Sequence, residues 1–158
     1  MAKGLVIYYS RSGNTLTMAK AIAEAMDNAG VPTHCKSVAD VQIDDLLEAD
    51  AIVVGSPTYY GQPAAPIAAL FDESVKRHGK LDGKIGAAFS SSANIAGGNE
   101  TTIWSILSRM LIHGMIIQGD PQGDHYGPVS IGKPDDRVLN QCTRRGQRIA
   151  ALAKKLFG

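Results

Sequence analysis

Short apolar segments alternate with helical patterns along the whole chain. Residues 5–9 form a continuous apolar run rich in β-branched side chains, and residues 15–29 then repeat apolar side chains at helical spacing. Apolar runs at 51–55 and 84–90 are again each followed by a helical pattern. This alternation predicts an α/β domain in which a parallel sheet carries helices on both faces through right-handed crossovers.

The expected elements fill the chain as one domain. At 158 residues, the length is that of a single domain of the usual ~150 residues, so we expect residues 1–158 to fold as one doubly wound unit. Five strands are expected, at 5–9, 32–38, 51–55, 84–90 and 115–117. Helices are expected at 15–29, 63–77, 103–111 and 134–157, with a short helical turn at 41–48 and one long irregular connection at 119–133.

Composition and charge argue against several classes of protein. Sixteen Lys and Arg stand against 15 Asp and Glu, a net charge of +1, so charge gives no reason to expect nucleic acid or a membrane surface as a partner. The first apolar run is too short for a signal sequence or a membrane span, and a soluble protein is expected. His34 and His78 have no partners at metal-ligand spacing, so no metal site is expected.

The cysteines indicate a cellular compartment. Cys35 and Cys142 are too few for a disulfide scaffold and do not form a CxxC pair. This pattern fits a reducing, cytoplasmic setting. Both side chains are expected to be buried thiols.

Polar and glycine-rich segments follow three of the expected strands. In an open doubly wound sheet, ligands bind outside the carboxyl ends of the strands, where the strand order reverses. The segments 10–15, 56–61 and 91–98 occupy these positions after the first, third and fourth strands. These three loops are therefore the candidate ligand site.

The first loop places hydroxyls and a glycine at the start of a helix. Free N–H groups and the helix dipole favour a phosphate there, whereas neither GxxxxGK[ST] nor GxGxxG occurs in the chain. A hydroxyl-rich pocket with one cation, Arg11, suits a phosphate monoester. The alternative is that its serines and threonines only cap the helix.

The other two loops add an aromatic wall and backbone donors. Tyr59 and Tyr60 are flat side chains suited either to a planar heterocycle or simply to covering the sheet edge. Gly97 and Gly98 lack bulk, so backbone N–H groups of the third loop can approach a ring edge. A phosphate loop, an aromatic wall and donors on one edge describe a site for flavin mononucleotide (FMN).

These segments resemble the flavodoxin family over nearly the whole chain. The pattern Ser10-x-Ser12-Gly13-x-Thr15 after an apolar strand is similar to the family's phosphate loop. The resemblance implies a five-stranded sheet of order 2-1-3-4-5, the order known for flavodoxins.

Within the family, further segments resemble the flavodoxin-like NAD(P)H:quinone oxidoreductases of the tryptophan-repressor-binding protein type. They are residues 55–61, 89–92, 97–103, 113–115 and 126–127. The chain departs from those reductases in two ways: it lacks their long insertion between the second and third strands, and residues 74–81 lack an aromatic side chain.

The resemblance implies a set of site residues. Those implied to bind FMN are Ser10, Arg11, Ser12, Gly13, Asn14, Thr15, Pro57, Thr58, Tyr59, Tyr60, Gly61, Ser91, Ser92, Ala93, Asn94, Ile95, Gly97, Gly98 and His113. The catalytic candidates are His113, Tyr60 and His125.

Alternative roles stay open for several of these side chains. His113 either contacts the flavin or simply favours the negative end of a helix dipole. For His125 and Tyr126, one role is to line a slot for nicotinamide or quinone, and the other is to belong to a surface loop. For Trp104, the expected role is packing or a subunit contact.

The expected function is an FMN-dependent oxidoreductase that passes two electrons from NADH or NADPH to a quinone-like acceptor, by ping-pong use of one cleft. The net charge of +1 favours this, since a strongly acidic shell would repel an anionic reduced flavin. One alternative is a flavodoxin-type one-electron carrier between redox proteins, without turnover of its own. Another is a flavin-binding subunit or regulatory protein. The resemblance also suggests a cytoplasmic homo-oligomer.

Overall fold

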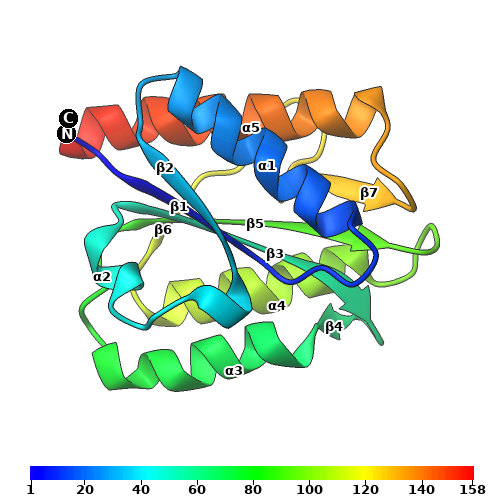
Figure 1. Ribbon diagram of the computed structural model, residues 1–158, viewed down its shortest axis with the longest axis horizontal. Helices are drawn as coiled ribbons and strands as arrows, with labels where there is room; N and C mark the ends of the chain where they lie inside the picture. Colours follow the sequence, from blue (N-terminus) through cyan, green and yellow to red (C-terminus); the bar gives the residue numbers. More distant parts are fainter.

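Five parallel strands form the centre of the structure, a computed structural model that describes residues 1–158 (Figure 1). They are β1 (Gly4–Tyr8), β2 (Thr33–Ser37), β3 (Ala51–Tyr59), β5 (Ile85–Ser92) and β6 (Ile116–Ile117). Their spatial order is β2-β1-β3-β5-β6. The order therefore reverses at β1, where β2 lies on one side and β3 on the other. The expected α/β fold with a parallel sheet is confirmed.

Two short strands extend the sheet beyond the expectation. Strand β4 (Gln62–Pro63) pairs antiparallel with the end of β3, and β7 (Val129–Ile131) pairs parallel with the end of β5. The sheet has seven strands, so the expectation of five strands in the order 2-1-3-4-5 is wrong in number and incomplete in order. Segments of two and three residues are too short to show a strand period, and β7 lies within the connection expected to be irregular.

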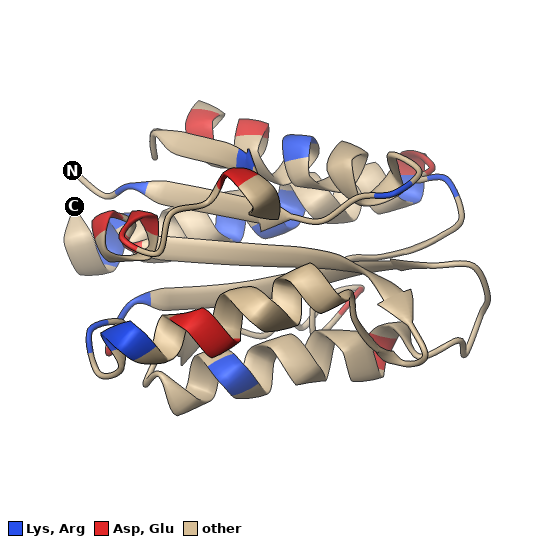
Figure 2. Ribbon diagram, turned by 60° about the horizontal axis from the view of Figure 1, so that its bottom comes forward, with Lys and Arg blue, Asp and Glu red and all other residues tan.

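Helices cover both faces of the sheet. Helices α1 (Asn14–Asn28) and α5 (Asp136–Phe157) lie on one face, and α2 (Asp45–Glu48), α3 (Ala65–Ser74) and α4 (Asn99–Ile112) lie on the other (Figure 1). Single 3₁₀ turns occur at Val38–Asp40 and Val75–Arg77. The central strands β3 and β5 contain no charged residue, and the charges lie on the helices, the loops and the edge strand β2 (Figure 2). No helix has both the length and the apolar character that a membrane crossing requires.

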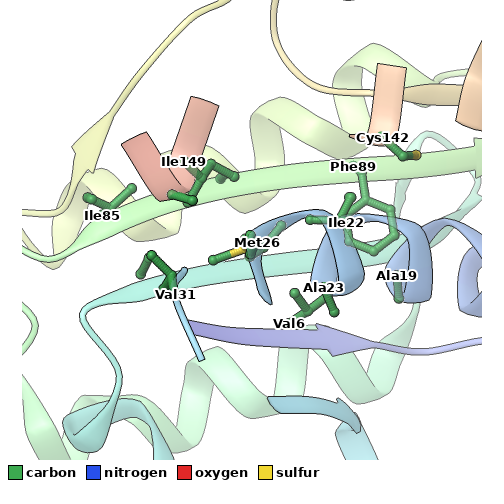
Figure 3. Close-up of a cluster of buried hydrophobic side chains, with 14 of the residues drawn as sticks. Val6, Ala19, Ile22, Ala23, Met26, Val31, Ile85, Phe89, Cys142 and Ile149 are labelled. Carbon is green, nitrogen blue, oxygen red and sulfur yellow. The ribbon is translucent and has the colours of Figure 1, made fainter. Parts of the chain in front are cut away.

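The core consists of two apolar clusters, one on each face of the sheet. Figure 3 shows the cluster beneath α1 and α5, in which Ile22 and Phe89 are fully buried. The opposite cluster contains Ile7 and Ile103, also fully buried. Because both faces are covered, the first four residues of β3, Ala51–Val54, are apolar without alternation. Burial of each such side chain contributes about 1.5–3 kcal/mol.

The two cysteines differ in exposure. Cys142 of α5 is buried in the core, and burial raises the pKa of its thiol to about 12. Cys35 is exposed, so the expectation that both thiols are buried is wrong for this residue. The reason is its position on β2, the outermost strand of the sheet, which has a neighbouring strand on one side only.

Close packing at the centre of the sheet predicts a sensitive glycine. Gly55 of β3 is paired with Phe89 of β5, and a Cβ atom at position 55 would overlap the Phe89 ring. We expect Gly55→Ala to lower the free energy of unfolding by about 1–3 kcal/mol or more, since a buried ring has little room to move. Urea denaturation measures this change.

The matched control is Gly119→Ala, whose Cβ would meet only the His125 carbonyl oxygen at 3.8 Å. Equal midpoints for the two variants would contradict the packing described here.

Candidate functional site

The segment before α1 and the carboxyl ends of β3 and β5 with the loops that follow them line an open cavity of about 550 Å³ at the carboxyl edge of the sheet. The lining residues are Arg11, Ser12, Asn14, Thr15, Pro57, Thr58, Tyr59, Ser91, Ser92, Ala93 and Gly132. A cavity of this size is typical of small-molecule sites. The three segments 10–15, 56–61 and 91–98, expected to form the ligand site, are therefore brought together in space.

The start of α1 forms one wall of this cavity. Gly13 precedes the helix with a positive φ of 97°, and no side chain caps the helix start. The Gly13 N–H donates to Ser10 Oγ at 3.1 Å, and the Thr17 hydroxyl donates to the Gly13 carbonyl at 2.9 Å. Since the first turn of α1 contains no acidic residue, its N–H groups and positive dipole end remain available to an anion.

Hydroxyl groups connect the start of α1 to the end of β5, and the end of β5 to the end of β3. Thr15 Oγ1 lies 2.9 Å from Ser91 Oγ, and Thr58 Oγ1 lies 2.9 Å from Ser90 Oγ. The Ser90 hydroxyl donates its proton to the Ser56 carbonyl at 2.8 Å, so Thr58 must be the donor to Ser90. The oxygen of Thr58 keeps acceptor capacity toward a ligand donor.

The second and third loops are in direct contact. Gly98 has a positive φ of 97°, and a Cβ there would lie 2.6 Å from the Gly61 Cα. The Thr101 hydroxyl donates to the Gly61 carbonyl at 2.7 Å, and Asn99 Nδ2 donates to Ser92 Oγ at 3.0 Å. Glycine is therefore required at position 98 for the loops to approach each other.

The two tyrosines of the second loop occupy different positions. Tyr59 is half-buried and lines the cavity, with its ring edge-on to Tyr9 at a centroid distance of 6.4 Å. Tyr60 and Gly61 form the two-residue turn between β3 and β4, with φ values of 52° and 73°. Such angles belong to a type I′ turn, which favours Asn-Gly. Tyr60 is fully exposed in this conformation, an unfavourable combination that is common where a side chain serves function.

His113 lies far from this cavity. It caps the far end of α4, whose 14 residues place its ends about 21 Å apart. Its Nε2 lies 2.7 Å from Ser74 Oγ, and the Ser74 hydroxyl donates to the Phe71 carbonyl, so Nε2 carries the proton. Burial, and secondarily the charge of His78, lower the pKa of His113. A single chain therefore does not bring His113 to the cavity, in contrast to the implied flavin contact.

His125 belongs to a segment held against α5. Its Nδ1 lies 2.8 Å from the Asp120 carbonyl oxygen. Arg144 donates to both carboxylate oxygens of Asp120 at 2.8 Å and thereby lowers the pKa of Asp120 to about 2. Buried Arg145 donates to the Gln118 carbonyl at 2.7 Å. These contacts hold the His125 segment against α5, and His125 does not line the cavity.

The remaining residues singled out from the sequence fall into two groups. Trp104 and Tyr126 contact each other, with ring centroids 5.2 Å apart, and both rings are partly exposed. Several implied residues belong to the three loops without lining the cavity: Ser10, Gly13, Tyr60, Gly61, Asn94, Ile95, Gly97 and Gly98. Gly132 lines the cavity but was missed, because it follows β7, a strand too short to recognise.

The fold and the cavity together define a class of protein: doubly wound α/β proteins that bind a ligand at the switch point of the sheet. A family model described as flavodoxin matches residues 6–100. The chain therefore belongs to the flavodoxin family.

Relatives of two kinds match the chain. An NAD(P)H dehydrogenase (quinone) from Azorhizobium caulinodans is 34% identical over 199 aligned positions, covering 100% of both chains. A flavodoxin from Aquifex aeolicus is 39% identical over 159 positions, covering 95% of this chain and 86% of the relative. Because this chain has 158 residues, 41 of the 199 positions have no counterpart in it.

Solved structures show the same fold. An archaeal flavodoxin superposes with a TM-score of 0.80 at 35% identity, covering 96% of this chain and 99% of that chain. A WrbA-like flavodoxin from Agrobacterium tumefaciens superposes with a TM-score of 0.83 at 26% identity, covering 98% and 99%.

The strained turn predicts a stabilising substitution. We expect Tyr60→Asn to raise the free energy of unfolding by about 1 kcal/mol, since asparagine tolerates a positive φ and the exposed ring loses no packing. Thermal or urea denaturation measures the change.

Tyr126→Asn is the comparison variant, because it removes a ring that contacts Trp104, and it should destabilise. A less stable Tyr60→Asn variant would show that the Tyr60 ring packs against the protein after all.

Proposed function

We propose that this protein binds FMN in the cavity and uses it to transfer two electrons from NADH or NADPH to a quinone-like acceptor. In the overall reaction, NAD(P)H, a proton and a quinone give NAD(P)⁺ and a hydroquinone. The relatives named NAD(P)H dehydrogenase (quinone), at 34% identity over the full chain, support this activity.

The uncapped start of α1 is the observation that carries the proposal. Its free N–H groups lie beside the hydroxyls of Ser12 and Thr15 and a single cation, Arg11. No aspartate or glutamate lines the cavity, so nothing there repels an anion. This chemistry fits the phosphate of FMN better than a triphosphate, which would require a lysine and a metal ion.

The other two loops fit the flavin ring system. The Tyr59 ring would supply a flat apolar wall. The Thr58 oxygen and the hydroxyls of Ser91 and Ser92 would exchange hydrogen bonds with the polar edge of the flavin ring, as acceptors and as donors. When bound, the flavin supplies the redox chemistry, and these residues orient it and exclude water.

The donor and the acceptor would use the same cavity in turn, which is a ping-pong scheme. Among the catalytic candidates, Tyr60 lies next to the cavity wall, directly after Tyr59. His113 would contact a flavin only if a second copy of the chain brought it to the cavity. The expected homo-oligomer could place the His113 of one chain at the cavity of another. His125 would reach the ligand only if its segment moved away from α5.

The chain also fits a reducing compartment. Cys35 is exposed and free, and Cys142 is buried and free. We place the protein in the cytoplasm on this ground, since an exposed thiol is readily oxidised elsewhere.

A one-electron flavodoxin carrier is the second candidate. Chain length favours it: the alignment to the quinone dehydrogenases leaves 41 positions without a counterpart, whereas the archaeal flavodoxin is covered over 99% of its length. Its partners would be redox proteins rather than a small acceptor.

A charge introduced at the start of α1 tests cofactor binding. We expect Ser12→Asp to weaken FMN binding at least tenfold, because a carboxylate would repel the phosphate across a few ångströms. Binding of riboflavin, which lacks the phosphate, should change by less than about threefold. Quenching of flavin fluorescence measures both affinities.

Ser12→Asn is the matched control, since it has the same shape without the charge. Equal losses of FMN and riboflavin affinity in Ser12→Asp would contradict phosphate binding at this helix.

Turnover tests the proposed reaction. The FMN-loaded protein should oxidise NADH or NADPH in the presence of benzoquinone, and an anaerobic redox titration should show one two-electron step. Two separate one-electron steps, with no oxidation of either nucleotide, would identify the carrier instead.

A further inference from the structure

An apolar groove of about 570 Å³ lies beside the candidate cavity. Its walls are the connection after β2, at residues 37–43, and the exposed side of α3. Tyr9 and Ser10 line the groove, and the cavity begins at the next residue, Arg11. The edge-on contact between Tyr9, which lines the groove, and Tyr59, which lines the cavity, lies where the two spaces adjoin.

The floor of the groove is an incompletely covered part of the core. Val38, Val41, Ile43 and Leu70 are all half-buried and pack against the apolar cluster beneath α3 and α4. Their outer surfaces line the groove. A ligand that covered these side chains would complete their burial, which favours an apolar occupant.

Charge limits the choice of occupant. Glu73 is the only charged side chain that lines the groove, and it is paired with Lys76 at 2.6 Å. The phosphates of a dinucleotide would find no lining cation and would meet a carboxylate. The groove is therefore suited to an uncharged apolar group and unsuited to the nicotinamide donor.

We infer that this groove holds the apolar tail of a lipid-like quinone whose ring is reduced in the neighbouring cavity. The inference rests on the proposed quinone reductase function and names its acceptor class as quinones with a long hydrocarbon substituent. The groove and the cavity are adjacent, since Tyr9 of the groove contacts Tyr59 of the cavity, and this supports a ligand with its two ends in the two spaces.

Two quinones with the same ring provide the kinetic test. Each methylene that enters the groove favours binding by about fourfold. We expect the KM of a benzoquinone with a ten-carbon tail to be at least tenfold lower than the KM of the same quinone without the tail. The measurement uses the FMN-loaded protein below the aggregation threshold of the tailed quinone.

A variant that fills the groove makes the test specific. Ala69 is an exposed residue of α3 that lines the groove, so Ala69→Trp should bring the ratio of the two KM values close to one. Ala151→Trp places the same side chain on the exposed side of α5 and should keep the wild-type ratio. A wild-type ratio near one, or the same ratio in both variants, would overturn the inference.

A binding measurement separates this inference from the proposed function. In methyl NMR spectra, the tailed quinone should shift the signals of Val38, Val41, Ile43 and Leu70, and the tail-free quinone should not. If neither quinone is turned over but these shifts occur, the groove stands and the reductase function fails. If turnover occurs without these shifts, the function stands and the groove assignment fails.

Shifts of the same methyl signals on raising the protein concentration alone would assign the groove to a second copy of the chain and overturn the inference.

Discussion

The exposed positive end of α1 is the interaction on which the functional account depends. Its N–H groups lack side-chain caps, and at the edge of a parallel sheet they point outward beyond the strands. The two core clusters hold this helix and the opposing helices on the sheet. Through the Thr15–Ser91 hydrogen bond, the helix start is fixed relative to β5 before any ligand arrives. Such preorganisation lowers the cost of binding.

The sequence predicted the parts of the fold that have a long apolar period. The five main strands and four longer helices occur where expected, since runs such as 51–55 and helices such as 15–29 bury whole faces. It did not predict β4 or β7, because pairs and triplets of residues carry no periodic signal and form only through tertiary contacts with β3 and β5.

The same distinction applies to the site. Residues at or shortly after the end of a long strand, such as Tyr59 and Ser12, line the cavity as expected. Gly132 was missed because its strand was missed. His113 was selected by resemblance alone. Its distance from the cavity follows from the length of α4, which begins at Asn99, four residues before the start expected from the sequence.

The central claim is that a phosphate occupies the start of α1, and a crystal structure of the protein grown with FMN tests it most directly. The account predicts phosphate oxygens within hydrogen-bond distance of the backbone N–H groups of residues 12–15, with the flavin ring against Tyr59. A flavin bound at another surface, or a phosphate held away from this helix, would contradict it.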